Sequence, residues 1–122
     1  MPPCPNIADC KPLGEAICGR LIVEIHKLGF PPEMIPGLPE FDRAGFSTAK
    51  DTYGGWDSLI GIWRNWQGHR LGEIKLHGDG SFYAEYDVAL QHPNDARWFV
   101  ECVVAWGRDG VIKTEARRLP AL

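Results

Sequence analysis

The sequence predicts an α+β domain with an N-terminal helix, a three-stranded antiparallel meander, a second helix and a short C-terminal strand, folded as a two-layer sandwich. Three patterns indicate this class. Residues 13–28 and residues 98–106 each have an apolar stripe at helical spacing, and residues 71–90 alternate between apolar and polar around a glycine-rich turn. Because a helix stripe and a sheet face both need an apolar surface to cover them, the two layers are expected to pack together.

The first helix is expected over residues 13–28. Pro12 suits the first turn of a helix, and Gly29 suits the position just past the end. The residues before it, 1–11, are expected to form a loose arm, and residues 12–122 a single domain, which is an ordinary size for one domain. Within that domain, repeated proline and glycine residues over 30–55 predict a long ordered loop, and loops of this kind often carry function.

The meander is expected from residues 58–66, 71–77 and 81–90. The first of these segments also fits a helical period, so a helix remains the alternative there. Gly78-Asp79-Gly80 is typical of a hairpin turn, because glycine readily supplies the positive φ angles that such turns need. A three-residue turn predicts a register that pairs Leu76 with Phe82, Ile74 with Ala84, Lys75 with Tyr83 and Glu73 with Glu85.

The second helix is expected from about residue 94 to residue 106. Asn94 or Asp95 suits its N-terminal cap and Gly107 its end, while the apolar residues between them recur at helical spacing. The valines of this segment also suit a strand, which is the alternative, and the helix is favoured. Residues 111–117 are expected to form the last strand.

The charge and hydropathy of the chain exclude two classes of partner. The formal charge is −3 and basic residues are not clustered, which argues against nucleic-acid binding. No apolar run approaches the roughly 20 residues of a membrane span, and the N-terminus does not resemble a signal peptide. A cytoplasmic location with reduced cysteines is therefore expected, and the partner is expected to be a protein or a small ligand.

No common catalytic motif or cofactor fingerprint is present, so no cofactor is predicted. The candidates for acid–base chemistry are His92, Glu85 and Asp87. Histidine titrates near neutral pH, and a carboxylate crowded by another carboxylate acquires a raised pKa.

The polar face of the predicted hairpin, with nearby tryptophans, is the candidate binding surface. Glu73 and Glu85, directly opposite each other, repel unless a cation lies between them, which could be Lys75, a metal, a basic partner or a substrate. The alternative is a solvated face with both side chains splayed into water. Surplus tryptophans indicate either an interface or one larger core. The candidate binding residues are Glu73, Lys75, His77, Tyr83, Glu85, Trp63 and Trp66.

A metal site is the least favoured hypothesis. Cys4, Cys10, Cys18 and His26 offer sulfur and nitrogen ligands, but their spacing does not match the close pairs typical of zinc sites. The favoured interpretation is that the N-terminal arm is mobile and carries two exposed thiols, and that the third cysteine is packed in the fold. Taken together, the residues predict a non-catalytic protein-interaction or ligand-binding domain. The alternative is a small enzyme with a histidine and carboxylate pocket between the long loop and the sheet.

Overall fold

The structure is a computed structural model, and it describes residues 6–29, 37–50, 57–89 and 99–120. Helix α1 (Ile7–Lys27) and the short 3-10 helix η2 (Phe41–Arg43) precede a six-stranded sheet. The strands are β1 (Gly45–Lys50), β2 (Asp57–Arg64), β3 (Arg70–His77), β4 (Ser81–Ala89), β5 (Phe99–Arg108) and β6 (Val111–Pro120). Each strand pairs antiparallel with the next, so their order in the sheet is their order in the sequence.

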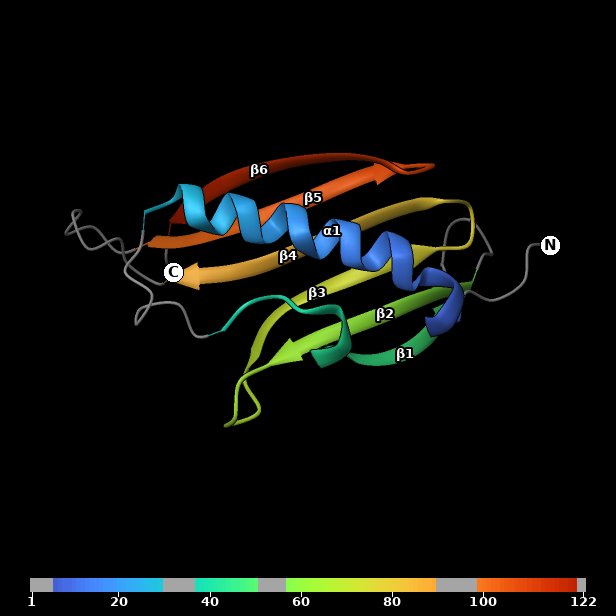
Figure 1. The fold of residues 1–122 in the computed structure, drawn as a ribbon. Helices are drawn as coiled ribbons and strands as arrows, with labels where there is room; N and C mark the ends of the chain where they lie inside the picture. The colour runs from blue at the N-terminus through green and yellow to red at the C-terminus, as the bar shows by residue number, and fades with distance from the viewer. Residues whose placement is uncertain (1–5, 30–36, 51–56, 90–98, 121–122) are drawn as a thin grey trace.

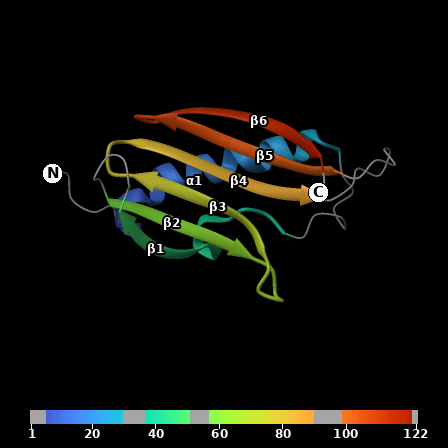
Figure 2. The ribbon, with the colours of Figure 1, turned by 180° about the vertical axis from the view of Figure 1, so that it is seen from behind.

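Helix α1 lies across one face of this sheet. It runs obliquely, with its first turns over the β1–β2 side and its last turns over the β5–β6 side (Figure 1). Seen from behind, the opposite face carries no helix of the described part of the chain (Figure 2). Among the described residues, no helix has the length and apolarity needed to cross a bilayer.

The predicted fold is α+β, but the predicted arrangement is wrong. The sheet has six strands rather than a three-stranded meander with a separate C-terminal strand, and the described part of the second predicted helix is β5. Val103 and Ala105 face the helix layer, while Cys102 and Val104 face the other way, and all four are buried. A strand that is buried on both faces has an almost continuous apolar sequence, and in this case its residues also matched a helical period.

The loop predicted over residues 30–55 is also partly wrong. Residues 41–43 form η2 and residues 45–50 form β1, which pairs along its whole length with β2. Phe46 stands opposite Gly61, and its ring packs against Phe41 with the centroids 4.8 Å apart. The strand therefore depends on contacts with distant residues. Residues 30–36 and 51–55 of the predicted loop lie outside the described residues.

The predictions for the hairpin are confirmed. Residues 58–64, 71–77 and 81–89 lie in β2, β3 and β4, and the β3–β4 register pairs Leu76 with Phe82, Ile74 with Ala84 and Glu73 with Glu85. The last strand is also confirmed and extends to Pro120. Here the glycine-rich turn and the alternating pattern both fix the same pairing, so the sequence is sufficient.

Helix α1 begins at Ile7, six residues before the predicted start. The side chain of Asn6 caps it by accepting a hydrogen bond from the Asp9 backbone N–H at 2.8 Å, and the Asn6 amide donates to the Asp9 carboxylate at 2.7 Å. Pro12 lies inside the helix rather than in its first turn. The cap compensates for the backbone hydrogen bond that a proline cannot donate. Residues 7–11, expected in a loose arm, are therefore helical.

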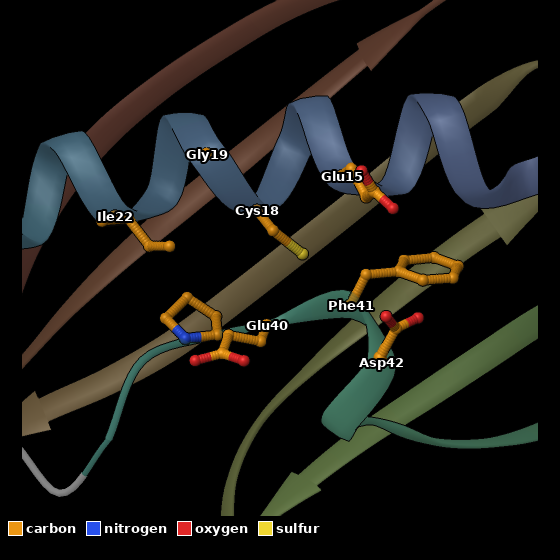
Figure 3. Close-up of a pocket in the computed structure, with 8 residues that line it drawn as sticks. Glu15, Cys18, Gly19, Ile22, Glu40, Phe41 and Asp42 are labelled. Carbon is orange, nitrogen blue, oxygen red and sulfur yellow. The ribbon is translucent and has the colours of Figure 1, made fainter.

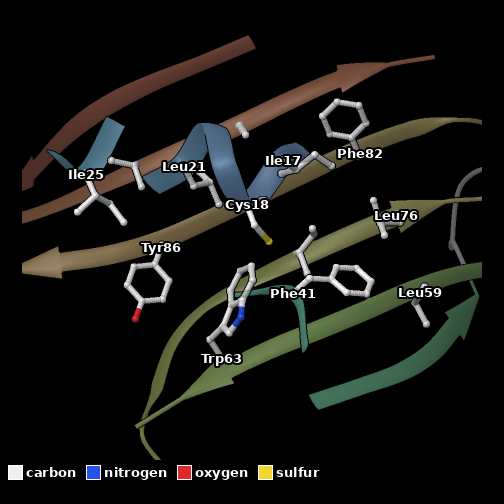
Figure 4. Packing of buried hydrophobic residues seen from close by; sticks show 14 residues of the cluster. Ile17, Cys18, Leu21, Ile25, Phe41, Leu59, Trp63, Leu76, Phe82 and Tyr86 are labelled. Atoms are coloured by element: carbon white, nitrogen blue, oxygen red, sulfur yellow. The ribbon is translucent and has the colours of Figure 1, made fainter. Parts of the chain in front are cut away.

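The core lies between α1 and the sheet (Figure 4). Ile17, Leu21 and Ile25 follow the predicted stripe and are completely buried. They pack on a sheet surface made by alternate residues of four strands: Leu59, Trp63, Ile74, Leu76, Phe82, Ala84, Tyr86, Val103 and Ala105. Because side chains alternate along a strand, the residues between these point to the opposite face.

Candidate functional site

The sheet face that points away from α1 is the candidate site, and we call it the open face. It carries most of the binding residues predicted from the sequence. Its described residues on the four strands from β3 to β6 are Glu73, Lys75, His77, Tyr83, Glu85, Asp87, Cys102, Val104, Trp106, Lys113, Glu115 and Arg117. Charged and polar side chains on β3, β4 and β6 flank two buried residues of β5, Cys102 and Val104.

Glu73 and Glu85 stand directly opposite each other, as predicted, and the cation between them is Arg70. Its Nη2 atom lies 2.7 Å from Glu85 Oε1 and 3.4 Å from Glu73 Oε1. Lys75, the residue proposed for this role, lies 3.6 Å from Glu73 Oε1 only. The two carboxylates raise the pKa of the Arg70 guanidinium, mainly through the hydrogen bond to Glu85.

The sequence analysis missed Arg70 because it began the strand at residue 71 and so left Arg70 outside it. The strand begins one residue earlier than expected, and the β2–β3 register shifts beside Arg64, so that Arg64 stands opposite Arg70. The feature of the sequence that could have indicated this ion pair is that Arg70 precedes Glu73 by three residues. It becomes informative only when the bulged end of the hairpin is known.

Tyr83 extends this network toward the middle of the sheet. Its hydroxyl donates a hydrogen bond to Glu85 Oε2 at 3.2 Å. Burial and then the neighbouring Glu85 carboxylate raise the pKa of Tyr83 to about 12. The phenol therefore stays protonated at neutral pH and acts as a donor.

Asp87 is the carboxylate whose environment most resembles that of an acid–base group. Burial and then the nearby Glu85 raise its pKa above the ordinary value, while Arg70 opposes the shift. It stands opposite Cys102, whose pKa is raised to about 11 by burial and by Asp87. A protonated thiol is a poor nucleophile, so this pair is not an activated cysteine site. His92, the third predicted catalytic residue, lies outside the described residues.

His77 has a hydrogen-bonding partner in the sheet. Its Nδ1 atom lies 2.7 Å from the hydroxyl oxygen of Ser58, which stands opposite it on β2. A serine beside a histidine is the arrangement of many nucleophilic enzymes. Ser58 is only 3% exposed, however, so a substrate has no access to its hydroxyl. The contact is therefore structural.

The two predicted binding tryptophans have opposite environments. Trp63 is a core residue: its indole N–H donates to the Glu40 carbonyl oxygen at 2.8 Å, and its ring meets Tyr86 edge-on. Trp66 lies in the β2–β3 turn and is 91% exposed. Trp63 therefore fits the alternative of one larger core, whereas Trp66 is an exposed ring.

Several hydrogen bonds stabilise the turn that carries Trp66. The side-chain oxygen of Asn65 accepts hydrogen bonds from the backbone N–H groups of Gln67 and His69, both at 2.9 Å. Backbone bonds also join Asn65 with His69 and Gly68 with Asn65, and Arg64 donates to the Gly68 carbonyl at 3.2 Å. The indole is thus held on an ordered turn, although no described side chain covers it.

The predicted metal ligands are not brought together. Cys10, Cys18 and His26 are spaced eight residues apart along α1, and each interval corresponds to about 12 Å of helix rise. One metal ion cannot bridge such a separation with bonds of about 2 Å. The structure as described contains no group of three or more potential ligands, and Cys4 lies outside it.

A pocket of about 380 Å³ lies between α1 and η2 (Figure 3). The thiol of Cys18 points into it beside Phe41, and the carboxylates of Glu15 and Asp42 lie at its rim. Lys11 lies 3.7 Å from Glu15 and 3.3 Å from Asp42. Burial raises the pKa of Cys18 to about 12, so the pocket has no reactive thiolate.

No family model, curated protein or solved structure matches the chain. Any functional conclusion therefore rests on the residues themselves.

Proposed function

We propose that this chain is a non-catalytic protein-interaction domain whose principal contact is Trp66. The observation that carries the proposal is the 91% exposure of this indole on a turn closed by several hydrogen bonds. Tryptophan, tyrosine and arginine dominate the energetics of protein interfaces. A ring held on an ordered turn loses little conformational entropy when it is buried by a partner.

The charges around Trp66 indicate the chemistry of the partner. Arg64, His69 and Arg70 surround the turn, although the whole chain has a formal charge of −3. Arg64 is exposed and forms no ion pair with a described residue, whereas Arg70 is already held by two glutamates. The proposed partner is a protein with an apolar pocket for the indole and a carboxylate at the rim for Arg64.

The chemistry of the open face supports a binding role over catalysis. Cys102 and Tyr83 stay protonated at neutral pH, and Ser58 is enclosed. The carboxylates Glu73 and Glu85 are occupied by Arg70. Such groups suit the polar border of an interface, because their hydrogen bonds and ion pairs are already formed.

The test compares two substitutions in the same turn. Gln67 is the matched control for Trp66, because it is also exposed and contributes only its backbone N–H to the turn. Proteins retained by the wild-type chain on an affinity column are identified and compared between Trp66→Ala and Gln67→Ala. A partner retained by the wild type and Gln67→Ala, but lost by Trp66→Ala, supports the proposal.

Affinity measurements with the purified partner make the test quantitative. We expect Trp66→Ala to weaken binding by about 30-fold or more, because truncation of a central interface residue costs about 2 kcal/mol or more. Gln67→Ala should change it less than about twofold, and added salt should weaken binding through Arg64. Equal retention of every partner by both variants contradicts the proposal.

A further inference from the structure

The outer edge of β6 has no described partner strand and is a second candidate binding surface. Strand β6 is the last of the sheet, and no described strand pairs with its far side. It is ten residues long and pairs with β5 without a register shift. An exposed edge of this kind is a template for pairing with another strand, and proteins discourage such pairing with proline, bulges, inward-pointing charges or charged edge side chains, lysine above all.

The hydrogen-bonding direction of each β6 residue follows from the hairpin that joins it to β5. Asp109 and Gly110 form a two-residue turn with positive φ angles of 53° and 83°. In such a hairpin the flanking pair, Arg108 and Val111, exchanges backbone hydrogen bonds. The bond from the Asp109 N–H to the Gly80 carbonyl, at 3.1 Å, fits this alternation because it points toward β4.

The free backbone groups of the β6 edge are therefore those of alternate residues. Lys113 and Glu115 use their backbone groups to pair with β5, whereas those of Ile112, Thr114 and Ala116 point outward. No proline lies in this segment, and the side chains that face the helix layer here are uncharged. Between residues 111 and 117 no proline, bulge or inward-pointing charge is present, and the charged side chains Lys113, Glu115 and Arg117 favour only a partner strand whose charges complement theirs.

We propose that this edge binds the same edge of a second copy of the chain. The β6 strands pair antiparallel about a two-fold axis at Thr114 and join the two sheets into one. The side chains that decide the occupant are Lys113, Glu115 and Arg117, which alternate in charge along the open face. A strand with alternating charges is complementary to an antiparallel copy of itself only in certain registers.

The charges select the register. Centred on Thr114, the pairing places Lys113 opposite Glu115 of the second copy, twice over. Centred on Lys113, it places two lysines together, and centred on Glu115 it places two glutamates together. An axis at Ala116 also avoids like charges, but it uses Pro120, which cannot donate a backbone hydrogen bond.

Two further observations favour the axis at Thr114. Lys113 is exposed and forms no ion pair with a described residue, so it is available to Glu115 of the second copy. On the helix side, Thr114 donates to Glu24 at 3.1 Å and accepts from Arg20 at 3.4 Å. Because both side chains contact Thr114, an axis at Thr114 brings one cation and one anion of each copy close to those of the other.

Sedimentation velocity over a range of concentrations measures the dimer, with two charge variants and their mixture. Lys113→Glu and Glu115→Lys each place like charges opposite each other at both symmetric positions. Each should raise the dimer dissociation constant about tenfold or more. An equimolar mixture of the two variants should form a heterodimer, because acidic side chains in one copy then meet basic ones in the other. The double variant Lys113→Glu/Glu115→Lys should dimerise like the wild type.

Amide hydrogen exchange gives an independent measurement. As the concentration of wild-type chain rises, protection should increase at Ile112, Thr114 and Ala116 and stay constant at Lys113 and Glu115. A wild-type chain that remains monomeric at millimolar concentration overturns the inference, as does a mixture that fails to rescue the two variants. Trp66→Ala should leave the dimer unchanged, so this result is independent of the proposed partner.

Discussion

Arg70 binds Glu85 through a contact of 2.7 Å between Nη2 and Oε1, and the same nitrogen lies 3.4 Å from Glu73. One guanidinium thus stabilises two carboxylates that the strand register places directly opposite each other. Like charges in this position repel each other when no cation intervenes.

We therefore expect Arg70→Met to lower the free energy of unfolding by about 1 kcal/mol at neutral pH, since partly exposed charge networks contribute on this scale. Urea denaturation measures the change. Lys113→Met, compared at a concentration at which the chain is monomeric, is the control, because Lys113 forms no ion pair with a described residue, and it should change the free energy by less than about 0.5 kcal/mol. An equal loss at both positions would contradict the role given to Arg70.

We expect Asp87 to make the stability of the fold depend on pH in the direction opposite to that of an ion-paired carboxylate. Its native-state pKa lies above the ordinary value of 3.8, because burial disfavours the charged form, so the folded chain binds its proton more tightly than the unfolded chain does. The stability associated with this group is present below the unfolded-state pKa and is lost as pH rises through the native-state pKa. Asp87→Asn should therefore gain stability relative to the wild type over this interval and keep the gain at neutral pH. Thermal melts from pH 3 to pH 7 test this expectation, and a constant difference across that range is the contrary outcome.

Two glycines of α1 form a matched pair for testing the contact between the helix and η2. A Cβ atom at Gly14 would lie 2.1 Å from Cε1 of the buried Phe41 ring, whereas one at Gly19 would meet nothing within 4 Å. Gly14→Ala should destabilise the fold by about 1–3 kcal/mol, because overpacking exceeds the gain in helix propensity. Gly19→Ala should stabilise it by up to about 1 kcal/mol. Chemical denaturation gives both values, and stabilisation by both substitutions would show that α1 and η2 are not in close contact.

Cysteine reactivity should differ sharply between the folded and unfolded chain. Burial raises the pKa of Cys18 to about 12 and that of Cys102 to about 11, so few thiolates form at these positions. Alkylation at mildly alkaline pH, followed by peptide mass spectrometry, should label both slowly in the native protein and rapidly in urea. Rapid labelling of Cys18 in the native state would contradict this expectation. It would mean that the pocket beside η2 admits the reagent and that the pKa of the Cys18 thiol is not raised.

The hairpin of β3 and β4 could be predicted from the sequence because its information is local. The turn and the alternating pattern on both sides determine which residues pair, and therefore that Glu73 faces Glu85. The cation between them could not be predicted, because the position of Arg70 depends on the bulged end of the β2–β3 hairpin. The contrast between Trp63 and Trp66 has a similar cause. Trp63 belongs to the core because tertiary structure brings Tyr86 and the Glu40 carbonyl, both distant in the sequence, against its indole.

The sequence by itself determined that the chain is α+β, that α1 buries one stripe, and that Phe82 and Tyr86 face the core while Glu85 and Asp87 face away. Period and turn chemistry are sufficient for those features. Tertiary structure alone decided that residues 99–108 form a strand, since those residues suit either element until β4 and β6 flank them. It also decided that β1 forms, because a short strand gains its hydrogen bonds and its burial from a neighbour that lies elsewhere in the sequence.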